Sequence, residues 1–119
     1  MKKFFITLLV LNLTLSIFSI EMETIQKKIV GGYWAQKGKQ YNQVFYYSFN
    51  NDNKTGNVYF TQNGKKIGEY KITYKIEDYF VIITTPGGDI IWEVAAITDS
   101  ILVIKSPGGN GEAATLRRQ

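Results

Sequence analysis

The stretch Tyr70-Lys71-Ile72-Thr73-Tyr74-Lys75-Ile76-Glu77 alternates apolar and polar residues without a break. Because successive side chains of a β-strand point to opposite faces, this alternation predicts a strand with one face on a core and the other in water. Asn63-Gly64 lies upstream, and both residue types tolerate the positive φ that a type I′ turn requires. The segment therefore predicts an antiparallel hairpin as the unit of the fold.

Turn-forming residues recur along the chain at the spacing of an all-β meander, in clusters at 50–56, 63–64, 77–78, 86–88, 98–100 and 107–111. Between them we expect eight strands, at Gly32–Gln36, Gln43–Phe49, Gly56–Thr61, Lys66–Ile76, Tyr79–Thr85, Ile90–Ala96, Ile101–Lys105 and Glu112–Arg118. Such strands can close on themselves and leave no sheet edge exposed. The expected fold class is all-β, an eight-stranded antiparallel up-and-down barrel over residues 31–119.

The first residues are typical of a secretory signal peptide. Two lysines follow Met1, and the apolar run from Phe4 to Phe18 is shorter than the roughly 20 residues of a bilayer-spanning helix. With Ser19 as a small residue for cleavage, we expect a signal helix at 1–19 and a secreted or periplasmic protein; an uncleaved anchor is the alternative. Residues 20–30 form a short segment in which Ile25 and Ile29 predict one or two helical turns.

The composition excludes several kinds of site. The 119 residues include no Cys and no His, so disulfides, thiolate metal sites, a lipid-modified cysteine and the commonest general base are all ruled out. The net charge of +4 falls to about +2 without Lys2 and Lys3, because 12 basic and 10 acidic residues remain. These lysines are spread along the chain, so we expect no nucleic-acid partner. We also expect no cofactor and no metal.

The carboxyl groups of Asp and Glu are the only acids left for catalysis, and they form no obvious pair. Asp89 and Glu93 flank one strand, where Glu93 has the opposite parity to Trp92 and is expected to point outward. Acid–base catalysis needs two carboxyls at a defined separation, one of them with a pKa raised by burial. We therefore expect no catalytic residues and no enzyme. The oxygen-rich run 50–53 is expected to be a plain loop rather than a calcium site.

Several motifs, taken in order, resemble the lipocalin family. Gly32-Tyr33-Trp34 is similar to the Gly-x-Trp signature of the first lipocalin strand, and Thr115-Leu116-Arg117-Arg118 is similar to the closing strand of bacterial lipocalin-like domains. Residues 49–56, 68–72 and 92–102 resemble the family's first hairpin, its glycine–x–tyrosine strand and its tryptophan strand. The resemblance covers about 29–119. It implies that Arg118 packs over Trp34 in a cation–π contact at the closed end of the barrel.

Five aromatic residues are expected to face the barrel interior: Tyr47, Phe49, Tyr70, Tyr74 and Trp92. They either line a pocket for a small hydrophobic ligand or fill a barrel that is shorter than a full lipocalin. The first alternative predicts an exported lipocalin-like binding protein. The second predicts an extracytoplasmic interaction or inhibitor module that contacts an envelope protein through the loops at 50–56, 86–88 and 107–111. In both cases we expect a monomer that meets a membrane only through its leader during export.

Overall fold

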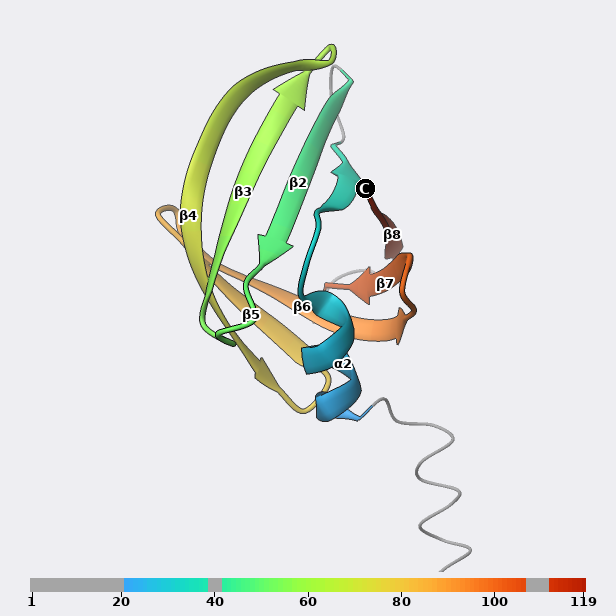
Figure 1. Ribbon diagram of the computed structural model, residues 1–119. Helices are drawn as coiled ribbons and strands as arrows, with labels where there is room; N and C mark the ends of the chain where they lie inside the picture. The colour runs from blue at the N-terminus through green and yellow to red at the C-terminus, as the bar shows by residue number, and fades with distance from the viewer. Residues whose placement is uncertain (1–20, 39–41, 107–111) are drawn as a thin grey trace, which may run out of the picture.

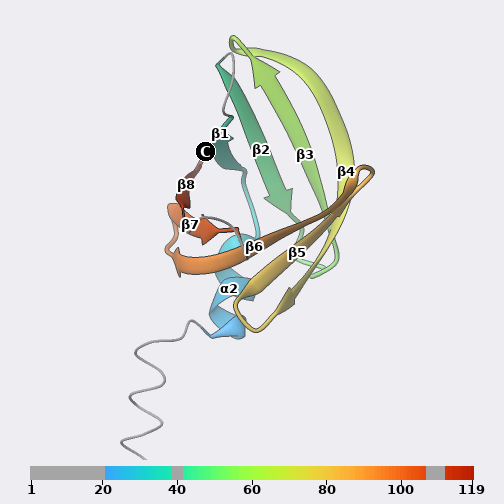
Figure 2. The same ribbon diagram turned by 180° about the vertical axis from the view of Figure 1, so that it is seen from behind.

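The computed structural model describes residues 21–38, 42–106 and 112–119, and shows a short helix and a closed eight-stranded barrel (Figure 1; Figure 2). The elements are α2 (Met22–Ile29), β1 (Trp34–Lys37), β2 (Gln43–Phe49), β3 (Thr55–Gln62), β4 (Lys65–Glu77), β5 (Phe80–Thr85), β6 (Gly88–Ile97), β7 (Ile101–Lys105) and β8 (Ala113–Arg118). Each strand pairs antiparallel with the next, and β8 returns to pair with β1. The predicted barrel is confirmed. The predicted leader and the 107–111 loop lie outside the described residues.

The strand bounds follow the alternation in the sequence, and the differences at the ends have local causes. β2 and β7 span the predicted residues. β1 begins at Trp34 rather than at Gly32, because Gly31 and Gly32 have φ values of +84° and +64°, which belong to a turn. β5 begins at Phe80 because Asp78 also has a positive φ. The other four strands differ from the prediction by one or two residues at one or both ends.

The long strand β4 joins the sheet of β1–β4 to the sheet of β5–β8 (Figure 1). Its residues 65–73 pair with β3 and its residues 73–77 pair with β5, so in the described ladders Thr73 is the one residue of β4 paired on both sides. The hairpin before it has the expected turn, with φ of 52° at Asn63 and 80° at Gly64. Upstream of Thr73, β4 runs beside β3 without a described partner on its other edge.

The seam that closes the barrel is short. β1 and β8 share two residue pairs, Trp34↔Arg118 and Ala35↔Arg117. The expectation that closure leaves no edge exposed is therefore wrong for the ends of β4 and β8 that extend beyond their ladders. We call the end with the 63–64 and 86–87 turns the open end, and the end with α2 and the 50–54, 78–79 and 98–100 turns the closed end.

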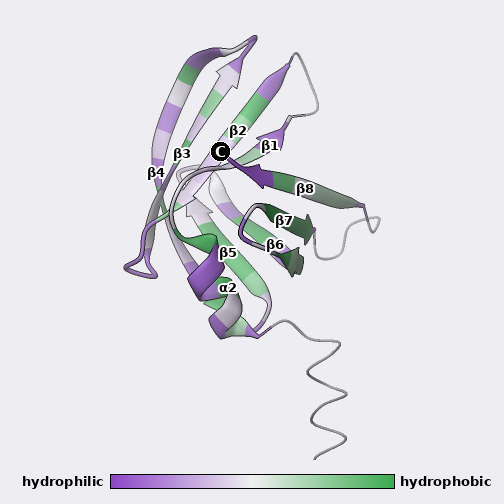
Figure 3. Ribbon diagram, turned by 45° about the vertical axis from the view of Figure 1, so that its right-hand side comes forward, coloured by the Kyte–Doolittle hydropathy of each residue, from purple (hydrophilic) through white to green (hydrophobic). Residues whose placement is uncertain are grey.

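The helix α2 covers the closed end. Ile25 and Ile29 lie one turn apart and are fully buried, whereas Glu23 and Lys27 form an ion pair on the water side. Of the strands around α2, β5–β7 consist largely of hydrophobic residues (Figure 3). The predicted helical turns are confirmed, and the helix contributes to the barrel core. Among the described residues, no helix is both long and apolar enough to cross a membrane.

Candidate functional site

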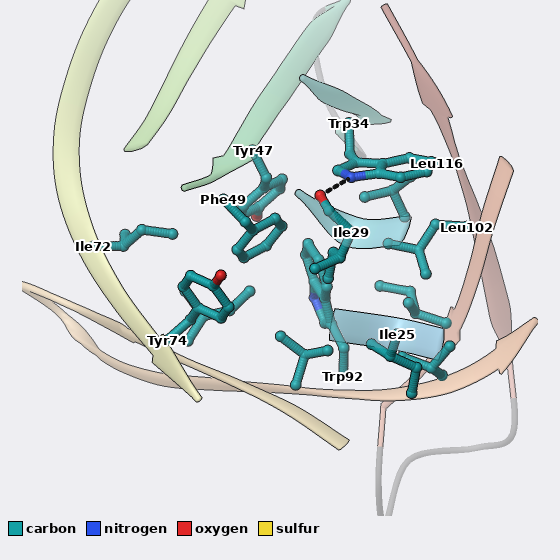
Figure 4. Close-up of a cluster of buried hydrophobic side chains, with 14 of the residues drawn as sticks. Ile25, Ile29, Trp34, Tyr47, Phe49, Ile72, Tyr74, Trp92, Leu102 and Leu116 are labelled. Carbon is teal, nitrogen blue, oxygen red and sulfur yellow. Dashed lines mark hydrogen bonds between the residues drawn. The ribbon is translucent and has the colours of Figure 1, made fainter. Parts of the chain in front are cut away.

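Four of the five predicted interior aromatic residues meet in the closed half of the barrel (Figure 4). Three pairs of rings pack edge to face. The ring centroids are 4.7 Å apart in Tyr47–Trp92, 4.9 Å in Phe49–Tyr74 and 5.9 Å in Phe49–Trp92. All four side chains are buried beside the isoleucines of α2. Such packing fills space, so in this half the aromatic residues form a core.

Trp34 and Arg118 meet as the resemblance implies. Trp34 is fully buried, and the Arg118 guanidinium carbon lies 4.3 Å from the centroid of its ring, in cation–π contact. Gly32 passes close to the arginine: a Cβ at this position would lie 3.6 Å from Arg118 Cγ and 3.4 Å from the carbonyl oxygen of Gln119. The glycine therefore combines a left-handed φ with a close approach to the last strand.

The same two side chains satisfy the carbonyl groups at the C-terminal end of α2. The indole Nε1–H of Trp34 donates to the Ile29 oxygen at 2.8 Å (Figure 4). The Arg118 guanidinium donates to the carbonyls of Lys28, Val30 and Gly31. A helix leaves its last carbonyls without intrahelical partners, and a cation is favourable there. Arg118 thus joins the helix, the first strand and the last strand.

An ion pair reinforces this end from the outside. Lys28 Nζ lies 2.8 Å from the Asp99 carboxylate, and Arg118 Nε donates to the Asp99 carbonyl at 2.6 Å. The hydrogen bond and charge of Lys28 lower the pKa of Asp99. Because both side chains are substantially exposed, we expect this pair to add little to stability.

The open half contains inward-facing side chains that remain partly exposed. We call Phe45, Tyr70, Ile90 and Ala114 the mouth residues; they come from β2, β4, β6 and β8. Each packs against the buried core, yet none of them is fully covered. They come from both sheets, β1–β4 and β5–β8. Of the five predicted aromatic residues, Tyr70 alone lies in this group.

An aromatic wall continues from Phe45 along β3 and β4. The Phe60 ring lies 5.7 Å from that of Phe45, and it covers Gly68 on the neighbouring strand so closely that a Cβ there would collide with it. The glycine of the predicted glycine–x–tyrosine strand therefore leaves room for a ring to lie against the backbone.

Two interior tyrosine hydroxyls form no hydrogen bond within the described part of the chain. Tyr74 donates to the Asn50 carbonyl at 2.7 Å, but the Tyr47 and Tyr70 hydroxyls form no hydrogen bond to any described residue. Burial and the neighbouring Tyr70 raise the pKa of Tyr47 to about 12, and burial also raises the pKa of Tyr70. Both hydroxyls stay protonated at neutral pH and can donate a hydrogen bond.

The acidic residues considered in the sequence form no cluster. Glu93 pairs across the strands with Lys105 on the outer face, and Glu77 forms an ion pair with Lys75 at 3.1 Å. In the described part of the chain, no three His, Cys, Asp or Glu side chains converge as metal ligands would.

The acid of the 50–56 loop organises its own turn. The Asp52 carboxylate accepts hydrogen bonds from the backbone nitrogens of Lys54 at 2.9 Å and Thr55 at 2.8 Å, and also from the Thr55 hydroxyl. The hydroxyl is the main reason that the pKa of Asp52 is lowered. These contacts are those of an ordinary Asx-type turn.

Sequence reasoning missed three of the four mouth residues. Phe45 shares the parity of Tyr47 and Phe49, which was a sufficient signal for an inward position. Ile90 shares the parity of Trp92, and Ala114 that of Leu116, which also indicates inward positions. Their partial exposure depends on where the neighbouring strands end. A second missed group, Tyr33, Tyr46 and Tyr59, lies on the outer face and becomes a cluster only through the strand register.

Comparison of the chain with protein-family models, with curated proteins and with solved structures finds no match. The lipocalin resemblance stays a prediction based on motifs in the sequence.

Proposed function

We propose that this protein is an exported, lipocalin-like binding protein that holds a small hydrophobic ligand at the open end of its barrel. The observation that carries the proposal is the incomplete cover over Phe45, Tyr70, Ile90 and Ala114, which point inward and pack on the core. Covering apolar side chains of this kind removes them from water, at about 25 cal/mol per Å² of apolar surface. Apolar side chains with a few polar groups among them are typical of small-molecule sites.

The lining favours a flat, uncharged ligand that carries a hydrogen-bond acceptor. Phe45, Phe60 and Tyr70 present rings, against which an aromatic or planar apolar group packs well. The Tyr47 and Tyr70 hydroxyls can donate to a carbonyl or hydroxyl oxygen of the ligand. The charged neighbours of Tyr70 in β4, Glu69 and Lys71, lie on the outer face.

Two features support the lipocalin-like and exported parts of the proposal. The Trp34–Arg118 contact is the one that the family resemblance implies. The expected leader ends at residue 19, before α2 begins at Met22, so cleavage there would remove none of the described contacts.

A fluorescence titration with N-phenyl-1-naphthylamine, followed by a panel of lipids and planar aromatic compounds, tests the ligand site. Ile90→Glu places a charge among the mouth residues and is expected to weaken binding at least about tenfold. Ile91→Glu is the matched control, because Ile91 is 44% exposed on the outer face. Tyr70→Phe keeps the ring and should weaken only ligands that accept a hydrogen bond. If no compound binds, or if both isoleucine variants behave alike, the ligand proposal is wrong and the filled-barrel interaction module becomes the better one.

N-terminal sequencing of the protein recovered outside the cytoplasm tests export. We expect cleavage after Ser19, so that the mature chain begins at Ile20. Retention in the cytoplasm with Met1 in place would contradict the export proposal and leave the ligand site untouched.

A further inference from the structure

Three tyrosines make contact on the outer wall formed by β1–β3. Tyr46 and Tyr59 are directly opposed across the strands and stack at 4.5 Å with an angle of 11° between their rings. Tyr33 meets Tyr59 edge to face at 4.9 Å. The adjacent residues Trp34, Tyr47 and Val58 are buried in the core, and all three tyrosines are half-buried. We call this group the outer tyrosine cluster.

The environment of the Tyr59 hydroxyl includes the other two hydroxyls of the cluster. Partial desolvation, followed by the neighbouring hydroxyls of Tyr46 and Tyr33, raises the pKa of Tyr59. Lys66 Nζ lies 5.3 Å from the Tyr59 ring centroid, above the ring. One face of Tyr59 is therefore stacked on Tyr46, and the ring also contacts a lysine and, in a T-shaped arrangement, Tyr33.

Positive charge surrounds this cluster. Among the described residues, four outward-facing cations share the wall formed by β8, β1–β3 and the part of β4 that pairs with β3: Lys37, Lys66, Lys71 and Arg117. In the described chain, no carboxylate forms an ion pair with Lys37, Lys71 or Arg117.

One carboxylate, Glu69, faces the same wall. It accepts a hydrogen bond from Asn57 at 2.6 Å and lies 3.1 Å from Lys66, and these two partners lower its pKa. Four cations and one anion leave the wall with a net charge of about +3. The wall across the barrel is mixed: it carries Glu77, Asp89 and Glu93 together with Lys75 and Lys105.

A groove of about 510 Å³ runs between β8, β1 and β2 beside the cluster. Its lining includes Lys37, Tyr46 and Arg117, so two unpaired cations and a tyrosine of the cluster border one depression. A phosphate headgroup could lie there between the two cations.

We propose that this wall docks on the surface of an anionic lipid bilayer. Tyrosine concentrates at the membrane–water interface, where its ring is sheltered and its hydroxyl stays among the headgroups. Lysine and arginine near an anionic leaflet are attracted to it. The inference goes beyond the proposed ligand site and is independent of it: it places the open end of the barrel beside a bilayer.

Nucleic acid is the other polyanion that a basic, aromatic wall could bind, and the ring geometry disfavours it. Single-stranded nucleic acids stack their bases on free aromatic faces. Tyr46 and Tyr59 stack on each other, and Lys66 lies above Tyr59, so the cluster presents mainly ring edges and hydroxyls. Those groups suit an interface of headgroups and water better than a column of bases.

The test is sedimentation of the full chain with vesicles of phosphatidylcholine that contain about 30% phosphatidylglycerol. The double variant Lys37→Glu/Lys66→Glu is expected to bind at least about tenfold more weakly. The matched control, Lys75→Glu/Lys105→Glu, changes the net charge equally on the other wall and should lose no more than about twofold. Both proteins keep the same N-terminal residues, so a contribution of the leader cancels. Circular dichroism checks that each variant folds.

A second readout reports which wall touches the lipid. Tyr46→Trp is expected to be quenched strongly by brominated phosphatidylglycerol, and Ile91→Trp on the opposite wall weakly. Equal losses in the two charge variants, equal quenching of the two tryptophans, or no binding beyond that to pure phosphatidylcholine would each overturn the proposal. So would an oligonucleotide that binds this wall while vesicles do not.

Discussion

The two ends of the barrel are built from the same strands, and they differ in what covers the inward side chains. Phe49 near the closed end is 1% exposed, whereas Phe45, on the same face of the same strand, stays half-buried. At the closed end, α2 and Arg118 lie over the core. At the open end, β4 has parted from β5 and the β1–β8 seam has ended. Burial in this barrel therefore follows from cover rather than from residue type.

Removing one ring from each end tests this comparison most strongly. Phe49→Ala is expected to cost about 3–5 kcal/mol of the free energy of unfolding, because it leaves a cavity in packed surroundings. Phe45→Ala should cost about 1–2 kcal/mol, since part of that ring already meets water. Urea unfolding monitored by circular dichroism measures both values. Equal losses would mean that the two ends are packed alike.

The two adjacent arginines provide the next contrast. Arg118→Ala is expected to lower the free energy of unfolding by about 2–3 kcal/mol, because the carbonyls at the end of α2 lose their donor and Trp34 loses its cover. Arg117→Ala changes an exposed, outward-facing side chain and should stay within about 0.5 kcal/mol. Arg118→Lys should fall between them, since an ammonium lacks the planar fork. A stable Arg118→Ala protein would show that the helix needs no such partner.

Alkaline pH provides a third test, through Tyr47. Unfolded Tyr47 loses its proton near the ordinary pKa of 10.0, whereas the folded residue keeps it until about 12. The contribution of protonated Tyr47 to the free energy of unfolding is therefore complete below pH 10.0 and is lost as the pH rises to about 12. The loss is on the order of 2 kcal/mol. Urea unfolding across this range should show a shallower decline for Tyr47→Phe than for the parent protein, and parallel curves would contradict the prediction.

The smallest expected effect separates two tyrosines of β4. Tyr74→Phe removes the hydroxyl that donates to the Asn50 carbonyl and should cost about 1 kcal/mol. Tyr70→Phe removes a hydroxyl without a partner among the described residues and should leave the free energy of unfolding unchanged within about 0.5 kcal/mol. Thermal unfolding of both variants measures the difference. A reversed order would place the structural hydroxyl at the open end.

The strands could be predicted from the sequence because their period is local. The alternation from Tyr70 to Glu77 and the Asn63-Gly64 turn each depend on a few neighbouring residues, and both are confirmed. The Trp34–Arg118 contact joins distant segments and came from the family resemblance alone, with no local signal behind it. The division of the interior into a packed half and an exposed half depends on where β5 and β1 end.

The outer tyrosine cluster could also be predicted only in part. Tyr46 and Tyr59 have the parity of outward residues, which the sequence reveals, but their stacking depends on the register between β2 and β3. The role of α2 was also underestimated: the spacing of Ile25 and Ile29 predicted helical turns, and nothing local showed that the helix would cover the barrel.

Thr73 has a mechanical consequence. Because the ladders on the two edges of β4 overlap at this residue, the sheet of β1–β4 and the sheet of β5–β8 are connected there by a single strand. The two sheets meet again only through the two residue pairs of the β1–β8 seam in the described ladders. Thr73 lies opposite the short β1–β8 seam, and the curvature of β4 around it sets how far apart the two sheets stand at the open end.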